Sequence, residues 1–223
     1  THRQRSRLRT PRQRRAHHPR LGTAMTGGAV TVKRKQQRAT RTHTKILVKA
    51  AHLFDTHGYA ATTINHVCES GQLTKGAIYH HFTSKEEIAG ALIGMWVDAA
   101  TDISNDIDGD PLDALTTLVS KLADTAAKNP ELRAGLKLST ETQIDASYTG
   151  YESWTSLVTE RICDAVDAGQ LVNTPAARLA GNGICAALVG FLVTPGSGFT
   201  FADRFAETVN AILTGLRPLK EAA

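Results

Sequence analysis

The sequence has few cysteines, few aromatic residues and no long uninterrupted apolar run. The three cysteines, Cys68, Cys163 and Cys185, are widely spaced and form no Cys-x-x-Cys pair. This excludes a zinc knuckle or a redox dithiol and predicts reduced thiols packed within helices. The sequence contains no uninterrupted run of about 18 apolar residues, so no membrane span is predicted. It also has no apolar stretch near its start that could act as a secretory signal. We therefore expect a cytoplasmic protein that does not enter a membrane.

Catalytic signatures are also missing. No Gly-x-Ser-x-Gly, His-Glu-x-x-His, phosphate-binding loop or dinucleotide fingerprint occurs. The histidines are scattered, and the adjacent His80 and His81 would point about 100° apart on a helix, which does not suit a shared metal. The sequence therefore predicts neither an enzyme nor a bound metal or cofactor.

Acidic residues are missing from one end of the chain. Residues 1–32 contain eight arginines and no acid, residues 33–85 carry a net charge of +7, and residues 86–223 carry −10. This asymmetry predicts a polyanion-binding head on an acidic body. Without apolar periodicity, residues 1–39 are expected to be a disordered basic arm. The arm is either an extra contact to DNA phosphates or a solvated run of charge.

The rest of the chain has the pattern of helices. Apolar residues recur at helical spacing, and Gly, Pro, Ser and Thr mark the ends. No segment alternates like a strand. We predict an all-α protein with a three-helix head over residues 40–83 and a six-helix ligand-binding and dimerisation body over 84–223. The expected helices begin near residues 40, 64, 74, 84, 111, 130, 151, 175 and 201, with a loop over 142–150.

The head contains two short helices separated by a tight turn, Gly71-Gln72-Leu73. Thr74 is placed to cap the second helix, which is expected over 74–81. Gly76 has no side chain, so the backbone at the start of this helix can come close to DNA in the major groove. Hydroxyls, amides and lysines at a helix start bind phosphate, whereas Ile78 and Phe82 are expected to be core. The predicted DNA-binding residues are Thr63, Gln72, Thr74, Lys75, Gly76, Tyr79, His80 and Lys85.

This segment carries a resemblance to a known family. Thr62-Thr63-Ile64, then Thr74 to Phe82 (TKGAIYHHF), then Ser84-Lys85-Glu86 resemble the N-terminal domain of TetR-family transcriptional regulators. The family pattern has Ala-Gly-Val at the turn, and Gln72 occupies the usual glycine position here. A non-glycine residue in a left-handed conformation there would cost roughly 1 kcal/mol. We expect the turn to be where the head departs from the family.

The body carries a narrower resemblance. The run from Leu132 to Leu138 (LRAGLKL), followed by a loop and Trp154, is similar to the γ-butyrolactone autoregulator receptors of antibiotic-producing actinomycetes. This resemblance implies a homodimeric repressor that controls specialised metabolism. It also implies a small hormone-like lactone, butenolide or furan as the ligand, with Trp154 in the pocket wall.

Several residues of the body are candidates for a ligand pocket. Aromatic residues make up only 5% of the chain, and a tryptophan is costly to pack without a use for its N–H, which favours Trp96 and Trp154. The aliphatic candidates can equally be plain core, while Gln143 and Tyr148 flank the expected loop and can hydrogen-bond a ligand. The predicted ligand-binding residues are Trp96, Leu118, Leu122, Gln143, Tyr148, Trp154 and Val158.

The last two expected helices are more apolar than one bundle requires, which predicts a four-helix interface between two copies of the chain. Two heads would then bind a pseudo-palindromic operator, and a ligand would tilt the 84–107 helix that links pocket to head. Two other functions stay open. One is a TetR-type repressor of an efflux gene that senses lipophilic drugs. The other is a nonspecific nucleoid-type DNA binder, which the basic arm favours and the acidic body opposes.

Overall fold

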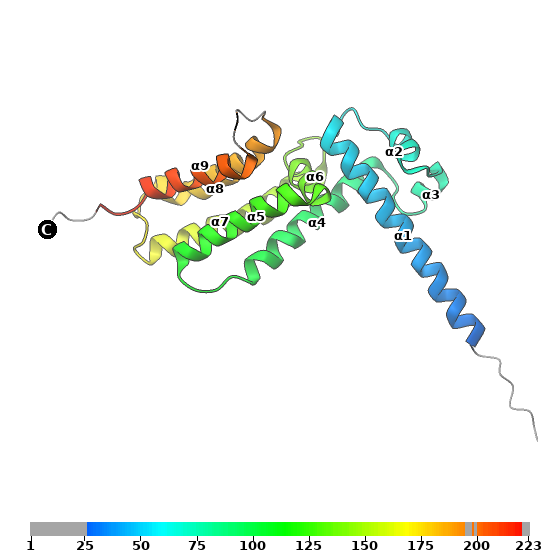
Figure 1. The fold of residues 1–223 in the computed structure, drawn as a ribbon, viewed down its shortest axis with the longest axis horizontal. Coiled ribbons are helices and arrows are strands. Elements are labelled where there is room, and N and C mark those ends of the chain that lie inside the picture. The colour runs from blue at the N-terminus through cyan, green and yellow to red at the C-terminus, as the bar shows by residue number, and fades with distance from the viewer. Residues whose placement is uncertain (1–25, 195–197, 199, 220–223) are drawn as a thin grey trace, which may run out of the picture. The chain divides into compact units, whose positions relative to one another are not determined.

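The computed structural model describes residues 26–194, 198 and 200–219, and within these residues the chain is all helical (Figure 1). This confirms the predicted fold class. The described helices are α1 Thr26–His57, α2 Ile64–Gly71, α3 Lys75–Tyr79, α4 Lys85–Asn105, α5 Pro111–Lys128, α6 Pro130–Leu138, α7 Asp145–Asp167, α8 Pro175–Val193 and α9 Phe201–Gly215.

The chain divides into two compact units, residues 1–39 and residues 40–223. The prediction of disorder over 1–39 is wrong for residues 26–39, which belong to α1. Lys, Arg, Gln and Ala are good helix formers, and lengthening an existing helix costs less than starting one. The rest of that prediction, residues 1–25, lies outside the described residues.

Helix ends in the second unit follow the local signals in the sequence. The hydroxyl oxygens of Thr63, Thr74 and Ser84 accept hydrogen bonds from the third backbone N–H of α2, α3 and α4, at 3.3, 3.1 and 3.0 Å. Gly58 ends α1 with a φ of +80°, a conformation that glycine adopts without steric cost. Helix α3 is shorter than the helix predicted over 74–81, because His80 and His81 already lie in the following turn.

The start of α7 differs from the prediction. A loop was expected up to Gly150, but α7 begins at Asp145. Its N-cap residue, Ile144, has no side chain that can cap the helix. Instead the backbone N–H of Asp145 donates to the carboxylate Oε1 of Glu86 in α4, at 3.0 Å. The helix is thus extended by a contact with a residue far away in the sequence, which local patterns do not reveal.

Helix α4 belongs to two hydrophobic cores. Its first half places Ile88, Leu92 and Ile93 in a core with residues of α1, α2 and α3. Its second half places Trp96 and Ala100 in a core with α5, α7, α8 and α9. Head and body therefore share α4, which passes from one core to the other between Ile93 and Trp96. Helix α6 also contributes Ala134 and Leu138 to the head core.

Two glycines let neighbouring helices approach α4 closely at this boundary. A Cβ at Gly135 in α6 would collide with the backbone oxygen of Leu92, and a Cβ at Gly150 in α7 would collide with Cγ2 of Ile93. Close-packed interiors do not accommodate such overlaps without backbone shifts. The two glycines therefore clamp α4 between α6 and α7.

Helix α8 is long and apolar enough to cross a membrane by length and composition, although the sequence was expected to hold no such segment. Only Arg178 and Asn182 interrupt its apolar and small residues. No more than 28% of the apolar stretch is buried. Part of the apolar surface of α8 is exposed, and Leu179 and Val193 are open to solvent.

Candidate DNA-binding surface and ligand pocket

The turn between α2 and α3 has the geometry that the sequence suggested. Gln72 lies in the left-handed region with φ 48° and ψ 49°, and it is the one non-glycine residue with positive φ in the described part of the chain. The N–H groups of Gln72 and Leu73 donate to the carbonyls of Glu69 and Cys68, at 3.2 and 2.9 Å. The turn is therefore closed by backbone bonds despite the unfavourable residue.

The helix-turn-helix presents one polar face. Ile78 and Phe82 are buried against α1 and α4 and fix α3 in place. The side chain of Tyr79 is 53% exposed, and the backbone around Gly76 is open, because a Cβ there would meet no heavy atom closer than 4.0 Å. Seven of the predicted DNA-binding residues are exposed at this corner: Thr63, Gln72, Thr74, Lys75, Gly76, Tyr79 and His80.

Lys85 is placed differently from the other predicted DNA-binding residues. Its ammonium group donates to the backbone oxygen of Tyr59 at 2.9 Å and lies 3.9 Å above the Tyr59 ring. Burial lowers the pKa of Lys85, although the charge of Glu141 opposes this shift. Lys85 therefore fastens the start of α4 to the residues that directly follow α1, and its ammonium group is engaged within the protein.

A histidine that the sequence analysis missed lies beside α3. His43 of α1 stacks on Phe82 with ring centroids 4.8 Å apart and meets the edge of His81 at 5.9 Å. Burial lowers the pKa of His81, and the neighbouring His80 and His43 lower it further. The spacing of His43 in α1 gave no signal for this contact, which depends on how α1 crosses α3.

Five of the predicted ligand-binding residues come together in the body. Trp96 and Trp154 are fully buried with ring centroids 5.8 Å apart in an edge-to-face arrangement. Trp154 Nε1–H donates to Ser139 Oγ at 3.3 Å, whereas Trp96 Nε1 has no hydrogen-bond partner. The other members of this core are Leu118, Leu122 and Val158.

The remaining two predicted ligand-binding residues lie at the surface. Tyr148 is 69% exposed and lines a cavity of about 440 Å³ where α6 meets α7, and Gln143 is exposed without lining it. Ser139 and Tyr151 line the same cavity and both contact Trp154, the latter with ring centroids 5.5 Å apart. Both residues lie outside the loop expected over 142–150, and the sequence analysis did not assign them to the ligand site. The lining residues are Ser139, Thr140, Thr142, Ile144, Asp145, Ser147, Tyr148 and Tyr151.

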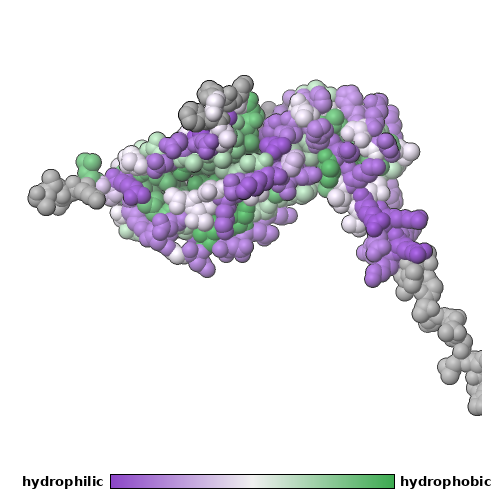
Figure 2. Space-filling view, in the orientation of Figure 1, coloured by the Kyte–Doolittle hydropathy of each residue, from purple (hydrophilic) through white to green (hydrophobic). Residues whose placement is uncertain are grey.

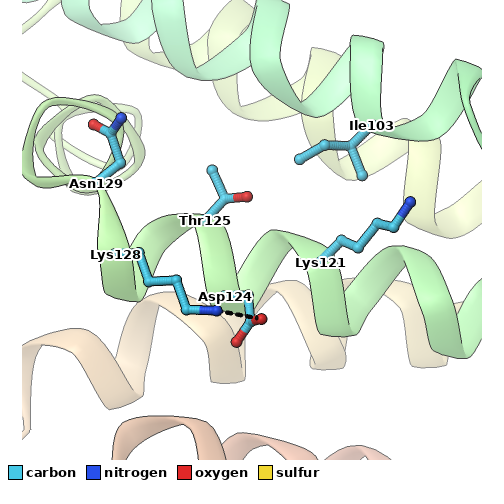
Figure 3. A pocket seen from close by; sticks show the side chains of 6 residues that line it. All are labelled: Ile103, Lys121, Asp124, Thr125, Lys128 and Asn129. Atoms are coloured by element: carbon cyan, nitrogen blue, oxygen red, sulfur yellow. Dashed lines mark hydrogen bonds and ion pairs between the residues drawn. The ribbon is translucent and has the colours of Figure 1, made fainter.

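Other hollows in the described part of the body lie away from the tryptophans. A cavity of about 490 Å³ between α4 and α5 has a charged wall, in which Lys128 and Asp124 form an ion pair at 2.8 Å (Figure 3). A groove of about 380 Å³ runs between α5 and α9, on a side where Figure 2 shows hydrophobic residues at the surface. Neither is lined by a residue of the tryptophan pair.

Two polar links join the head to the helices around the α6–α7 cavity. Asp55 of α1 receives hydrogen bonds from Arg133 and Lys137 of α6, at 2.9 and 3.1 Å. Burial acts to raise the pKa of Asp55, but the hydrogen bonds and charges of the two cations outweigh it, and the pKa is lowered. The second link is the bond from Asp145 to Glu86. These bonds would therefore transmit a movement of α6 or α7 to the head.

The short capped helix on a rigid corner and the exposed hydroxyl and lysine groups have the geometry of a DNA-binding helix-turn-helix, attached here to a larger helical body. Residues 46–92 match the family described as bacterial regulatory proteins, tetR family. Residues 46–92 therefore carry the N-terminal domain of this family, as the sequence predicted.

Relatives place the chain near a subgroup of that family. It is 36% identical to the A-factor receptor protein of Streptomyces griseus over 107 residues, which are 48% of this chain and 38% of the relative. The chain thus spans well under half the length of that relative. It is also 36% identical over 58 residues to the regulator UidR of Escherichia coli, 26% of this chain and 30% of that protein.

Solved structures agree over a longer stretch. A γ-butyrolactone receptor described as ArpA-like superposes with a TM-score of 0.71 at 29% identity, covering 82% of this chain and 91% of that one. CprB from Streptomyces coelicolor, in complex with its biological operator sequence, gives a TM-score of 0.68 at 28% identity over the same shares. The resemblance to γ-butyrolactone receptors therefore extends through the body.

Proposed function

We propose that this protein is a transcriptional repressor that binds a pseudo-palindromic operator and is released by a small lactone-, butenolide- or furan-type signalling molecule. The observation that carries the proposal is the joining, through α4, of an exposed helix-turn-helix corner to a body whose core holds a buried tryptophan pair. The likeness to the A-factor receptor and to CprB supports it. The protein acts by binding and not by catalysis.

The proposed DNA contacts divide into two kinds. Thr63, Thr74 and Lys75 lie at helix starts, where backbone amides, hydroxyls and an ammonium group bind phosphate oxygens. Gly76, Tyr79 and His80 lie on the outer side of α3, where the helix can enter the major groove. Gln72 at the turn adds a polar side chain beside them. The nucleic acid is double-stranded DNA, which places the protein in the cytoplasm.

The proposed ligand is small and uncharged. The buried polar side chains of the described residues are all serines or threonines, and none is acidic. A cationic drug in such a core would lack a counter-charge and would be costly to bury. This favours a signalling molecule over the lipophilic drugs of an efflux repressor. The proposed contacts are Trp96, Leu118, Leu122, Trp154 and Val158, with Tyr148 and Gln143 at the entrance.

The proposed assembly is a homodimer through α8 and α9. The two helices pack on each other and leave apolar residues such as Leu179 and Val193 exposed. Pairing these faces between two copies would form a four-helix interface and remove the exposed apolar area from water. The two heads would then bind half-sites about one helical turn of DNA, ~34–36 Å, or a multiple of it apart.

Release follows from differential binding. A ligand in the body changes the position of α4, and the head moves because α4 contributes to its core. The ligand must bind the conformation that does not fit the operator more tightly than the one that does. A lactone that raises the melting temperature but leaves operator affinity unchanged would contradict this mechanism.

The experiment that tests the proposal is a gel shift with the DNA upstream of the protein's own gene, with and without an extract of the producing culture. We expect a discrete protein–DNA complex that persists in an excess of unrelated duplex and dissociates when the extract is added. Loss of the complex to unrelated duplex would favour the nonspecific DNA binder. Dissociation of the complex by lipophilic cations, and not by lactones or furans, would favour the efflux repressor.

A further inference from the structure

The two buried tryptophans of the body differ in the state of their N–H groups. Trp154 donates to Ser139 Oγ, and that hydroxyl in turn donates to the backbone oxygen of Leu136, at 2.7 Å. Trp96 is equally buried, yet its Nε1 has no hydrogen-bond partner. Buried donors are almost always paired, and an unpaired one disfavours the conformation that holds it.

We propose that the N–H of Trp96 is the donor for a carbonyl oxygen of the ligand, and that it selects ligands with an acceptor at this point. The inference rests on the proposed function and assigns one contact within it. The side chains that share this core with Trp96 are apolar, including Ala100, Leu115 and Leu118. They supply no acceptor, whereas a lactone or butenolide carbonyl does.

The position of Trp96 on α4 gives this contact a second role. It is the first residue of α4 in the body core, one turn beyond Leu92 and Ile93 in the head core. At those two residues α4 is clamped by Gly135 and Gly150. A ligand bonded to Trp96 therefore acts on α4 beside the clamp, while the other end of α4 leads directly to α3. Recognition of the ligand and release of the head pass through one residue.

The α6–α7 cavity provides the approach to this contact. Its volume, about 440 Å³, lies within the range of small-molecule sites. Ser139 and Tyr151 line it and contact Trp154, which in turn contacts Trp96. In this proposal the ligand displaces these side chains to reach the Trp96 N–H. A hydrocarbon of the same shape would leave that N–H unpaired and would bind more weakly.

The test compares two probes on the full chain by titration calorimetry. The probes are γ-decalactone and the corresponding hexyl-substituted tetrahydrofuran, which has the ring and tail but no carbonyl. We expect the unaltered protein to prefer the lactone by about tenfold. Trp96→Phe should lose this preference. The comparison variant, Trp154→Phe, removes another proposed contact and should weaken the binding of both probes alike. The ratio between the two probes should persist, because the Trp154 N–H is already bonded within the protein.

A lactone preference that persists in Trp96→Phe overturns the inference, as does a lack of lactone binding by the unaltered protein. If Trp96→Phe does not fold, benzothienylalanine at position 96 keeps the ring shape, replaces N–H by sulfur and should likewise lose the preference. The proposed function has its own readout in the operator gel shift. Release by the lactone in both the unaltered protein and Trp96→Phe would leave that function standing and remove only this inference.

A measurement without ligand checks the premise. Both Trp→Phe variants lose the same atoms from the same core, so the difference in their melting temperatures reports the hydrogen bond of the lost N–H. We expect Trp154→Phe to melt at the lower temperature. The reverse order would contradict the premise that only the Trp154 N–H is bonded within the protein, and the inference would fall.

Discussion

The head and the body both build their sites around α4, but they gather their residues in opposite ways. The exposed residues of the head, Thr63 to His80, come from one short stretch and are positioned by their own caps and turn. The body brings together Trp96, Leu118 and Trp154 from three different helices. The head surface is therefore specified by local sequence, whereas the body site exists only when the helices are packed.

The strongest test of this contrast is Trp154→Ala. Removing a fully buried tryptophan from the body core should lower the free energy of unfolding by about 3–5 kcal/mol. Because α4 joins the two cores, chemical denaturation should show one shifted transition for head and body together. Two separate transitions, with the head unaffected, would mean that the cores are independent.

Tyr79→Ala tests the opposite side of the comparison. Tyr79 is exposed, so its loss should leave the melting temperature unchanged but weaken operator binding by tenfold or more, since a base or phosphate contact contributes roughly 1–3 kcal/mol. Binding is measured by gel shift at moderate salt. Tyr148→Ala, which removes a still more exposed tyrosine from the body, serves as the control and should retain full affinity. Unchanged affinity of Tyr79→Ala would refute the assignment of α3 as the reading helix.

Asp55→Asn tests the link between the two regions. The lowered pKa of Asp55 means that its contribution to stability is present above the usual carboxyl range and is lost as the pH falls through the lowered value. The variant should be less stable by about 2 kcal/mol at neutral pH and should lose part of the acid dependence of the melting temperature. Asp167→Asn removes the exposed pair with Arg178 and should change little. Equal effects of both substitutions would contradict the link.

Gln72→Gly probes the smallest effect. Glycine adopts the left-handed conformation of this turn without steric cost, so the variant should gain about 1 kcal/mol in the free energy of unfolding. Gln72→Ala should show no such gain. A loss of operator affinity in both variants, at unchanged or raised stability, would assign a direct DNA contact to the Gln72 side chain.

The sequence predicted what depends on neighbours in the chain. The caps at Thr63, Thr74 and Ser84, the strained turn at Gln72 and the helix stop at Gly58 all act within a few residues. The predictions that were wrong depend on context. The extension of α1 back to residue 26 reflects the cooperativity of a helix that is already formed.

The errors at the sites have a similar physical cause. Glu86 accepts a hydrogen bond from the start of α7, so the loop expected over 142–150 is partly helical. Ser139 and Tyr151 lie outside that loop and were missed because their contacts with Trp154 depend on how the helices pack. Lys85 is drawn inward by Tyr59, which is distant in the sequence. The dimer face and the identity of the ligand contacts remain proposals, because both depend on molecules outside a single chain.

The sharing of α4 between two cores limits how the protein can be cut. Residues 40–83 read as a domain in the sequence, but a fragment ending there would lack Ile88, Leu92 and Ile93, which complete its own core. Such a fragment would expose Ile46, Phe54 and Ile78 to water. A head transplanted onto another body must therefore bring the first half of α4 with it. It must also replace the contacts of Ala134, Leu138 and Ile144, which lie beyond α4 and belong to the same core.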